Sequence, residues 1–291
     1  MIRVNIKNLL MRTWMNRFVS LKICVVSSIF LVLSVLAVYA NQEKDIGTPN
    51  KGTQKLSRGY LNINDLPETY LIPPPPALGT AGFTLDDEIN KKNLKLQGTP
   101  RFKLAAKDAD LSFPNAADIF SCAVDAPITE KDTPRLYTLM RRMLIDAGNL
   151  SERAKRKYWR ERPYLINKEP TCVPEYEKHM KNSSSYPSGH TIAGWAWALV
   201  LTEIVPDRAD AILERGRAYG ESRIVCNVHW YSDVIEGFLL GSALTAKLHA
   251  LFEFRSDLDA ARTEISNIKK KGVKPNKDCK KEFEIIRYTS N

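Results

Sequence analysis

The most restrictive feature of this chain is a segment that is apolar on nearly every side of the helix it would form. Residues 191–205 include Ile192, Trp195 and Leu199, and Pro206 follows where such a helix would end. A helix without a polar face must be covered by other elements on all sides. We therefore expect a buried central helix with other helices packed around it.

Other segments have the periodicity of helices that face a core on one side. Helices are expected at residues 84–96, 100–106, 134–144, 151–159, 209–223 and 233–254. The last segment is long and apolar, but Glu236, Lys247 and His249 favour a core helix over a membrane span. Alternating strand patterns are scarce. The sequence predicts an all-α, single-domain helical bundle with a central buried helix over residues 65–268.

The two ends of the chain lack this patterning. Residues 41–64 are polar and are expected to be flexible, whereas the proline-rich stretch at 65–78 should run extended along a surface. Residues 269–291 form a Lys-rich tail that is expected to be solvated. A basic tail can bind nucleic acid, but no nucleic-acid partner is required to explain one, and the net charge of +10 comes in large part from the two ends.

The N-terminus has the pattern of an export signal. Residues 1–40 carry basic residues and no acidic ones, and the apolar run that follows Lys22 ends with Val38 and Ala40 at the −3 and −1 positions of a cleavage site. We expect a cleaved signal peptide and a periplasmic or secreted protein. The run also approaches the ~18–20 residues of a bilayer span, so an uncleaved leader would anchor the chain in a membrane.

The cysteines fit an exported protein. Beyond the leader the chain has Cys122, Cys172, Cys226 and Cys279, which permit two disulfides in three possible pairings. Cys226 is expected to be a disulfide partner or a buried thiol. No CxxC pair is present, so a zinc site is not expected.

Three short segments carry the groups needed to hold a phosphate. They are Lys155-x6-Arg162-Pro163, Pro187-Ser188-Gly189-His190 and Ser222-Arg223-x5-His229-x3-Asp233. Phosphoryl transfer spreads negative charge over three oxygens, and Lys155, Arg162 and Arg223 supply cations for them. The backbone N–H groups of Ser188, Gly189 and His190 lie at the start of the apolar helix and would add donors at its positive end.

The two histidines could divide the chemistry. Asp233 lies one helical turn beyond His229, so its carboxylate could accept the Nδ1 proton and leave Nε2 as a nucleophile. His190 could protonate the leaving group and then activate water. No carboxylate cluster suits magnesium or calcium and no glycine-rich Walker loop is present, so we expect neither a metal nor a cofactor.

The three segments resemble the motif of the type 2 phosphatidic acid phosphatase superfamily, which includes vanadium haloperoxidases. The stretches DLPETYLIPPPP, SYPSGHTIAGWAWALVLTEIVP and GESRIVCNVHWYSDV are similar to bacterial class A non-specific acid phosphatases. The resemblance covers residues 65–261. It implies a helical homo-oligomer that hydrolyses small-molecule phosphate monoesters with broad specificity through a phosphohistidine.

The resemblance also implies roles at the matching positions. Catalysis would rest on His229, His190 and Asp233, and phosphate binding on Lys155, Arg162, Ser188, Gly189 and Arg223. Two departures lie beside the site. The chain has Asn182-Ser183-Ser184-Ser185 where the family usually has Asn-Gly-Ser, and Asn227 where glycine is common.

Several neighbouring residues have simpler interpretations. Arg153, Arg156, Lys157 and Arg160 are interpreted as a solvated basic face around Lys155. Tyr186 would either line the substrate pocket or brace the turn. No role is expected for His179 or His249.

Three other functions compete with a soluble phosphomonoesterase. Vanadium haloperoxidases share the site but are usually much longer chains, and lipid phosphate phosphatases need several membrane spans, which the sequence after residue 40 does not offer. A non-enzymatic anion-binding protein would not need the complete catalytic set.

Overall fold

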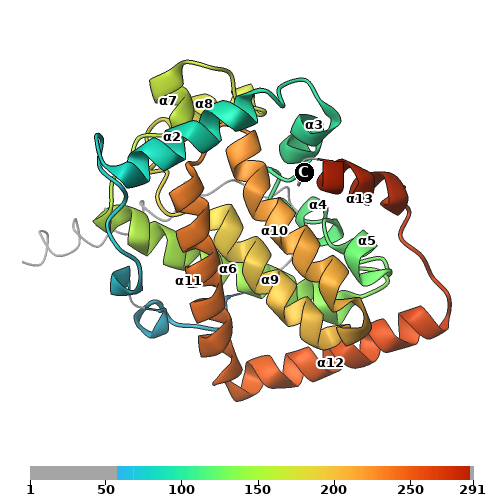
Figure 1. The fold of residues 1–291 in the computed structure, drawn as a ribbon. Helices are drawn as coiled ribbons and strands as arrows, with labels where there is room; N and C mark the ends of the chain where they lie inside the picture. The colour runs from blue at the N-terminus through green and yellow to red at the C-terminus, as the bar shows by residue number, and fades with distance from the viewer. Residues whose placement is uncertain (1–57, 68, 289–291) are drawn as a thin grey trace, which may run out of the picture. The chain divides into compact units, whose positions relative to one another are not determined.

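The computed structural model describes residues 58–67 and 69–288. The predicted signal peptide at residues 1–40 lies outside these ranges, as does most of the predicted flexible segment 41–64. Within the described residues every regular element is an α-helix or a 3₁₀-helix, which confirms the predicted all-α class (Figure 1).

The predicted central helix is α9 (Gly189–Ile204), and it packs along α10 (Ala209–Val225), α11 (Tyr231–His249) and α6 (Pro134–Lys157) (Figure 1). Trp197 in α9 is fully buried and its indole Nε1–H donates to the Met140 carbonyl of α6 at 3.0 Å. A Cβ on Gly241 of α11 would lie 2.9 Å from the Ile192 carbonyl oxygen. Glycine there allows the two helix backbones to approach closely.

The remaining helices cover this core. They are α2 (Ala81–Leu94), α3 (Pro100–Lys107), α4 (Asn115–Asp118), α5 (Ser121–Val124), α7 (Pro163–Asn167), α8 (Glu177–Met180), α12 (Phe252–Lys270) and α13 (Cys279–Tyr288), with the 3₁₀ turns Ile63–Asp65, Thr69–Leu71, Pro174–Tyr176 and Pro206–Arg208. Two of these helices begin with a threonine cap. The side chains of Thr80 and Thr99 accept the N–H groups of Phe83 and Phe102 and so cap α2 and α3.

Two predicted helix boundaries differ in the structure. The segments expected at 134–144 and 151–159 are one continuous helix, α6, because the buried face continues through Ala147, Leu150 and Ala154. The segment expected at 233–254 is two helices, since α11 ends at His249 and α12 starts at Phe252 with a bend of 98°. No single described helix is long and apolar enough to cross a membrane, and α11 and α12 meet that criterion only as this bent pair.

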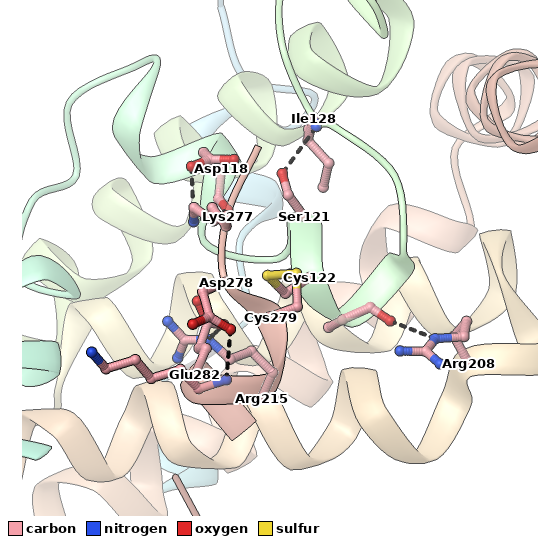
Figure 2. Close-up of a disulfide and its surroundings, with 12 residues drawn as sticks. Asp118, Ser121, Cys122, Ile128, Arg208, Arg215, Lys277, Asp278, Cys279 and Glu282 are labelled. Atoms are coloured by element: carbon pink, nitrogen blue, oxygen red, sulfur yellow. Dashed lines mark hydrogen bonds and ion pairs between the residues drawn. A yellow bond between two sulfur atoms is a disulfide. The ribbon is translucent and has the colours of Figure 1, made fainter. Parts of the chain in front are cut away.

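The predicted Lys-rich tail at 269–291 is not wholly a solvated extension. Figure 2 shows α13 joined to α5 by a disulfide between Cys122 and Cys279, with Lys277 beside Asp118. Ile286 is buried, and Glu282 pairs with the buried Arg215 at 3.1 Å. The lysines hide the amphipathic pattern of this helix in the sequence, and its buried face belongs to the domain.

The described part of the predicted flexible N-terminus is also held on the domain. The backbone N–H groups of Tyr60 and Leu61 donate to the Asp146 carboxylate of α6, at 2.8 and 3.1 Å. The Tyr60 hydroxyl donates to Asp257 of α12, and its ring lies 3.6 Å from the Arg142 guanidinium carbon. The domain therefore begins before residue 65.

Candidate active site

The three predicted segments meet where helix ends come together. Lys155 lies in the last turn of α6 and Arg162 immediately precedes α7. Ser188 caps α9, Arg223 lies in the last turn of α10, and Asp233 is in the first turn of α11. His190 and His229 lie close enough to these cations for their pKa values to respond to them. The structure therefore brings the predicted residues together, although their roles are a separate question.

His229 and Asp233 have the predicted arrangement, with a long contact between them. Nδ1 of His229 lies 3.4 Å from Oδ2 of Asp233, beyond the usual range for a hydrogen bond of this type. The same oxygen accepts the Trp230 backbone N–H at 2.9 Å, which ties the carboxylate to the start of α11. Nε2 of His229 faces the other way and lies 3.3 Å from Nη1 of Arg162.

The pKa of His229 is lowered well below its usual value of 6.5. Burial is the largest cause, followed by the charges of Arg162, Arg223 and Lys155, while a hydrogen bond to the Ser185 backbone opposes them. Burial therefore lowers this pKa more than any one of the three cations does. The lowered pKa favours the neutral ring, whose Nε2 then accepts from Nη1 of Arg162.

Arg162 and Arg223 differ in how they are held. Arg162 donates to three backbone carbonyls, those of Val228, Met180 and Ser184, and is thereby fixed. Arg223 is 2% exposed, and its Nε and Nη1 have no hydrogen-bond partner in the described part of the structure. Burial and the charge of Arg162 lower the pKa of Arg223 to about 10.

The cations are crowded together, and the charges of Asp233 and Glu152 offset them only in part. Burial and the neighbouring Arg162 also lower the pKa of Lys155, and its ion pair is with Glu152 at 3.4 Å. A buried donor without a partner costs about 1–3 kcal/mol, and more when it is charged. A bound anion would supply the missing acceptors and charge. This chemistry fits a site built for a multiply charged oxyanion.

The backbone N–H of Ser188 is already hydrogen-bonded within the protein, contrary to the prediction that it would face an anion. The Ser188 backbone N–H donates to the Asp233 carbonyl at 3.0 Å, and its hydroxyl accepts the Thr191 N–H as the cap of α9. The N–H groups left to face an anion are those of Gly189 and His190, in the first turn, where no intrahelical acceptor exists. A Cβ on Gly189 would lie 2.7 Å from the Ser151 hydroxyl, so glycine is needed there for packing as well.

His190 is fixed by the backbone of a neighbouring loop. Its Nε2 lies 3.0 Å from the Ala109 carbonyl oxygen and therefore carries a hydrogen, which leaves Nδ1 as the nitrogen that can exchange a proton. Burial and Arg223 lower the pKa of His190 well below 6.5, and the Ala109 carbonyl opposes them.

Sequence reasoning missed three polar residues around Asp233. Arg160 is buried, contrary to its interpretation as part of a solvated face, and pairs with Asp233 and Asp86. Helix α6 ends at Lys157, three residues before Arg160, so helical periodicity could not indicate where the Arg160 side chain would lie. Ser185, within the unusual Ser183-Ser185 run, hydrogen-bonds Asp233 through its side chain. No sequence signal pointed to Asp86.

Two open questions beside the site are answered by contacts. Tyr186 is fully buried and its hydroxyl donates to the Pro73 carbonyl at 2.6 Å, so it braces the turn. Asn227 has a φ of 60°, a left-handed conformation that explains why glycine is common at this position. Its side chain adds hydrogen bonds to Asn90 and Asn167, which glycine cannot make.

The second disulfide lies next to Asn227. Cys172 forms a disulfide with Cys226, which immediately precedes Asn227. The Cys172 N–H also donates to the Cys226 carbonyl. Together with the pair at α13, it settles the pairing that the sequence left open. Among the described residues no group of three or more His, Cys, Asp or Glu side chains is arranged to hold a metal ion.

The chain is similar to several known proteins. Residues 136–257 match the PAP2 superfamily. A non-specific acid phosphatase of Providencia stuartii is 42% identical over 223 residues, covering 76% of this chain and 90% of that protein. A non-specific acid phosphatase of Salmonella typhimurium is 38% identical over 68% of this chain and 80% of its own length. An acid phosphatase of Zymomonas mobilis is 38% identical over 68% of this chain and 75% of its own length.

Proposed function

The chain belongs to the PAP2 superfamily, within its group of non-specific acid phosphatases, and we propose that this acid phosphatase works through a phosphohistidine at His229 without a metal ion. Its substrates would be small phosphate monoesters of many kinds. The observation that carries the proposal is the buried guanidinium of Arg223, two of whose nitrogens have no partner in the described part of the chain, close to a histidine whose lowered pKa favours its neutral form. A phosphate dianion would satisfy the cation, and the histidine would attack it.

In the first step, Nε2 of His229 attacks the phosphorus atom and the ester P–O bond breaks. The oxygens of the transferred group are held by Lys155, Arg162 and Arg223 and by the N–H groups at the start of α9. His190 gives its Nδ1 proton to the leaving oxygen, which departs as an alcohol. Asp233 favours the Nδ1–H tautomer of His229 and balances the charge that develops on the ring.

In the second step, a water molecule replaces the histidine on phosphorus. His190, now neutral, removes the water proton, and the P–N bond breaks to release inorganic phosphate. His229 returns to its neutral form, and His190 holds the proton for the next cycle. Atoms and charges balance without a further reactant, and cations of the protein take the place that a metal ion fills in other phosphatases.

The proposal extends to location and inhibition. The export-signal pattern of residues 1–40 supports a periplasmic or secreted enzyme, with membrane attachment only if the leader is retained. Vanadate should inhibit because its five-coordinate form resembles the transition state. A homo-oligomer also remains a prediction from the family resemblance.

The direct test is hydrolysis of p-nitrophenyl phosphate by the purified enzyme, with and without EDTA. We expect full activity after EDTA treatment, loss of activity with vanadate, and no turnover by His229→Ala. His179→Ala is the matched control, because His179 is an exposed histidine of α8 outside the site. Activity that disappears with EDTA and returns with a divalent ion would overturn metal independence.

A further inference from the structure

Arg160 forms a bridge between two buried carboxylates. Its side chain is 7% exposed, while Asp86 and Asp233 are 1% and 0% exposed. Nη1 donates to Oδ1 of Asp233 at 2.7 Å, and Nη2 donates to Oδ2 of Asp86 at 2.6 Å. Ion pairs this deeply buried are costly unless their geometry is good, and this one uses the planar fork that lysine lacks.

Asp86 is itself fixed by the start of α11. It lies in α2, and its Oδ1 accepts the Ser232 backbone N–H at 2.7 Å, while its Oδ2 accepts the Ser232 hydroxyl at 2.7 Å. The Ser232 hydroxyl is also 2.7 Å from Nη1 of Arg160. Asp86, Ser232 and Arg160 therefore form one closed polar cluster at the end of the helix that carries Asp233.

As a result, the two oxygens of Asp233 have different hydrogen-bond partners. Oδ1 is occupied by Arg160, and Oδ2 faces the Trp230 N–H and Nδ1 of His229. A carboxylate held at one oxygen in this way cannot rotate to exchange its oxygens without breaking a charged hydrogen bond. The contact between Asp233 and His229 is long, so the orientation of the carboxylate depends on its other partners.

We propose that Arg160, with Asp86 behind it, is a positioning residue for phosphate-ester hydrolysis, because it fixes the Asp233 carboxylate that orients His229. The proposal rests on the proposed function, in which His229 is the nucleophile. Arg160 touches neither the substrate nor the reacting atoms in this scheme. It acts through Asp233.

The charges explain why two carboxylates share one guanidinium. Paired with Asp233 alone, Arg160 would neutralise the charge that His229 needs when its ring becomes cationic. Asp86 takes up part of the positive charge, so that the cluster of three groups keeps a net negative charge next to His229. Other charged or titratable groups near Asp233 are Lys155, Arg162, Tyr186 and His229.

The ionisation of Asp233 also depends on Arg160. Burial raises the pKa of Asp233, and the charge and hydrogen bonds of Arg160 oppose this effect. Without Arg160, the carboxyl group would protonate at a higher pH and would lose the negative charge that strengthens its hydrogen bond from Nδ1 of His229.

The first experiment compares Arg160→Met with the wild-type enzyme on p-nitrophenyl phosphate. We expect kcat to fall by about 10²-fold, a loss typical of a misplaced catalytic group, while KM changes far less. The acid limb of the pH profile of kcat should move to higher pH. Arg156→Met is the matched control, since Arg156 is exposed in the same basic run, and it should behave as wild type.

The decisive arm is a double-mutant cycle with Asp233→Asn. If Arg160 acts through Asp233, Arg160→Met should cost little further activity in the Asp233→Asn background. Equal fold losses in both backgrounds would overturn the proposal and leave Arg160 with a structural role only. Arg160→Lys, which keeps the charge but cannot bridge both carboxylates, replaces Arg160→Met in the cycle if the methionine variant does not fold. Its kcat should recover only in part, and full wild-type activity would also contradict the proposal.

His229→Ala separates this inference from the proposed function. An inactive His229→Ala alongside a fully active Arg160→Met would remove only the role of Arg160. A fully active His229→Ala would remove the nucleophile on which both accounts depend.

Discussion

Nη1 of Arg162 lies 3.3 Å from Nε2 of His229, so a fixed cation stands beside the nitrogen that we propose attacks phosphorus. Arg162 cannot easily leave, because its other contacts are backbone carbonyls of three different segments. The two nitrogens are in direct contact and leave no space for an atom between them, so an oxygen of the transferred group would have to accept the Arg162 N–H before Nε2 could attack. Arg223, by contrast, has no hydrogen-bond partner for Nε and Nη1 among the residues that the structure describes, so it carries a separate prediction.

Arg223→Met should abolish anion binding without destabilising the empty enzyme. The substitution removes a buried guanidinium whose Nε and Nη1 lack acceptors within residues 58–67 and 69–288, and a buried unsatisfied charged group costs more than about 1–3 kcal/mol. Thermal melts with and without phosphate measure both effects. We expect an unchanged or higher Tm without phosphate and no increase when phosphate is added.

Arg101→Met is the control for this prediction. Arg101 is equally buried, but it donates to the Ser222 hydroxyl and to the Ala218 carbonyl, at 2.9 and 2.8 Å. Its removal should lower the Tm. If Arg223→Met lowers the Tm as much as Arg101→Met and keeps the phosphate-induced increase, the unpartnered guanidinium is not an anion site.

Anion binding should take up a proton at mildly acidic pH. In the empty enzyme the pKa of His190 is lowered well below 6.5, so the ring is neutral near pH 6. A bound dianion favours the protonated ring and raises its pKa. Titration calorimetry with sulfate, which does not itself titrate in this range, in buffers of different ionisation enthalpy measures the uptake. We expect uptake by the wild-type enzyme and a clear decrease in His190→Ala; zero uptake in both would contradict the assignment.

The same histidines set the sign of the pH dependence of stability. His190 and His229 have folded pKa values below the 6.5 of an ordinary histidine, so the unfolded chain binds more protons as the pH falls. The stability of the empty enzyme is fully present above about pH 6.5 with respect to these groups and declines as the pH falls toward their folded values. A bound oxyanion should offset part of this loss.

His190→Ala should discriminate between leaving groups. A poor leaving group such as an alkyl alkoxide needs the proton from His190, whereas p-nitrophenolate needs very little. We expect kcat to fall by about 10²-fold or more for an alkyl phosphate and much less for p-nitrophenyl phosphate. Equal losses for the two substrates would remove His190 from the general-acid role.

The two disulfides should differ in their effects on activity. Cys122–Cys279 holds α13 on α5, and replacing both cysteines by serine should lower stability by about 2–4 kcal/mol while kcat is largely kept. Cys172–Cys226 lies next to Asn227 and the loop that carries His229, so its removal should lower both stability and kcat. Chemical denaturation and steady-state assays of the two double variants check this, and a kcat that is insensitive to Cys172–Cys226 would contradict it.

The sequence predicts the parts of this protein that repeat a local pattern. The apolar run at α9 indicates the central helix, and the spacing within each segment selects Lys155, Arg162 and Arg223 from many basic residues. The burial of His229 depends on residues from many parts of the fold, so no local sequence pattern predicts it.

What the sequence could not predict depends on contacts between distant segments. Arg160 follows the end of a helix, so no periodicity places it, and its partner Asp86 is far away in the chain. The α13 helix looks like a basic tail until Cys279 is joined to Cys122. The break between α11 and α12 occurs within apolar residues, at Ala250 and Leu251, where no proline or glycine signals it.

The central claim is that His229 carries the phosphoryl group during turnover. The most direct measurement is a rapid quench in alkali of enzyme mixed with ³²P-labelled substrate, followed by peptide mapping, because phosphohistidine is stable in alkali and lost in acid. We predict label on the peptide that contains His229, none in His229→Ala, and a labelled fraction that grows in His190→Ala if dephosphorylation is slowed more than attack. Label on a serine or on another histidine, or full activity in His229→Ala, would contradict the account.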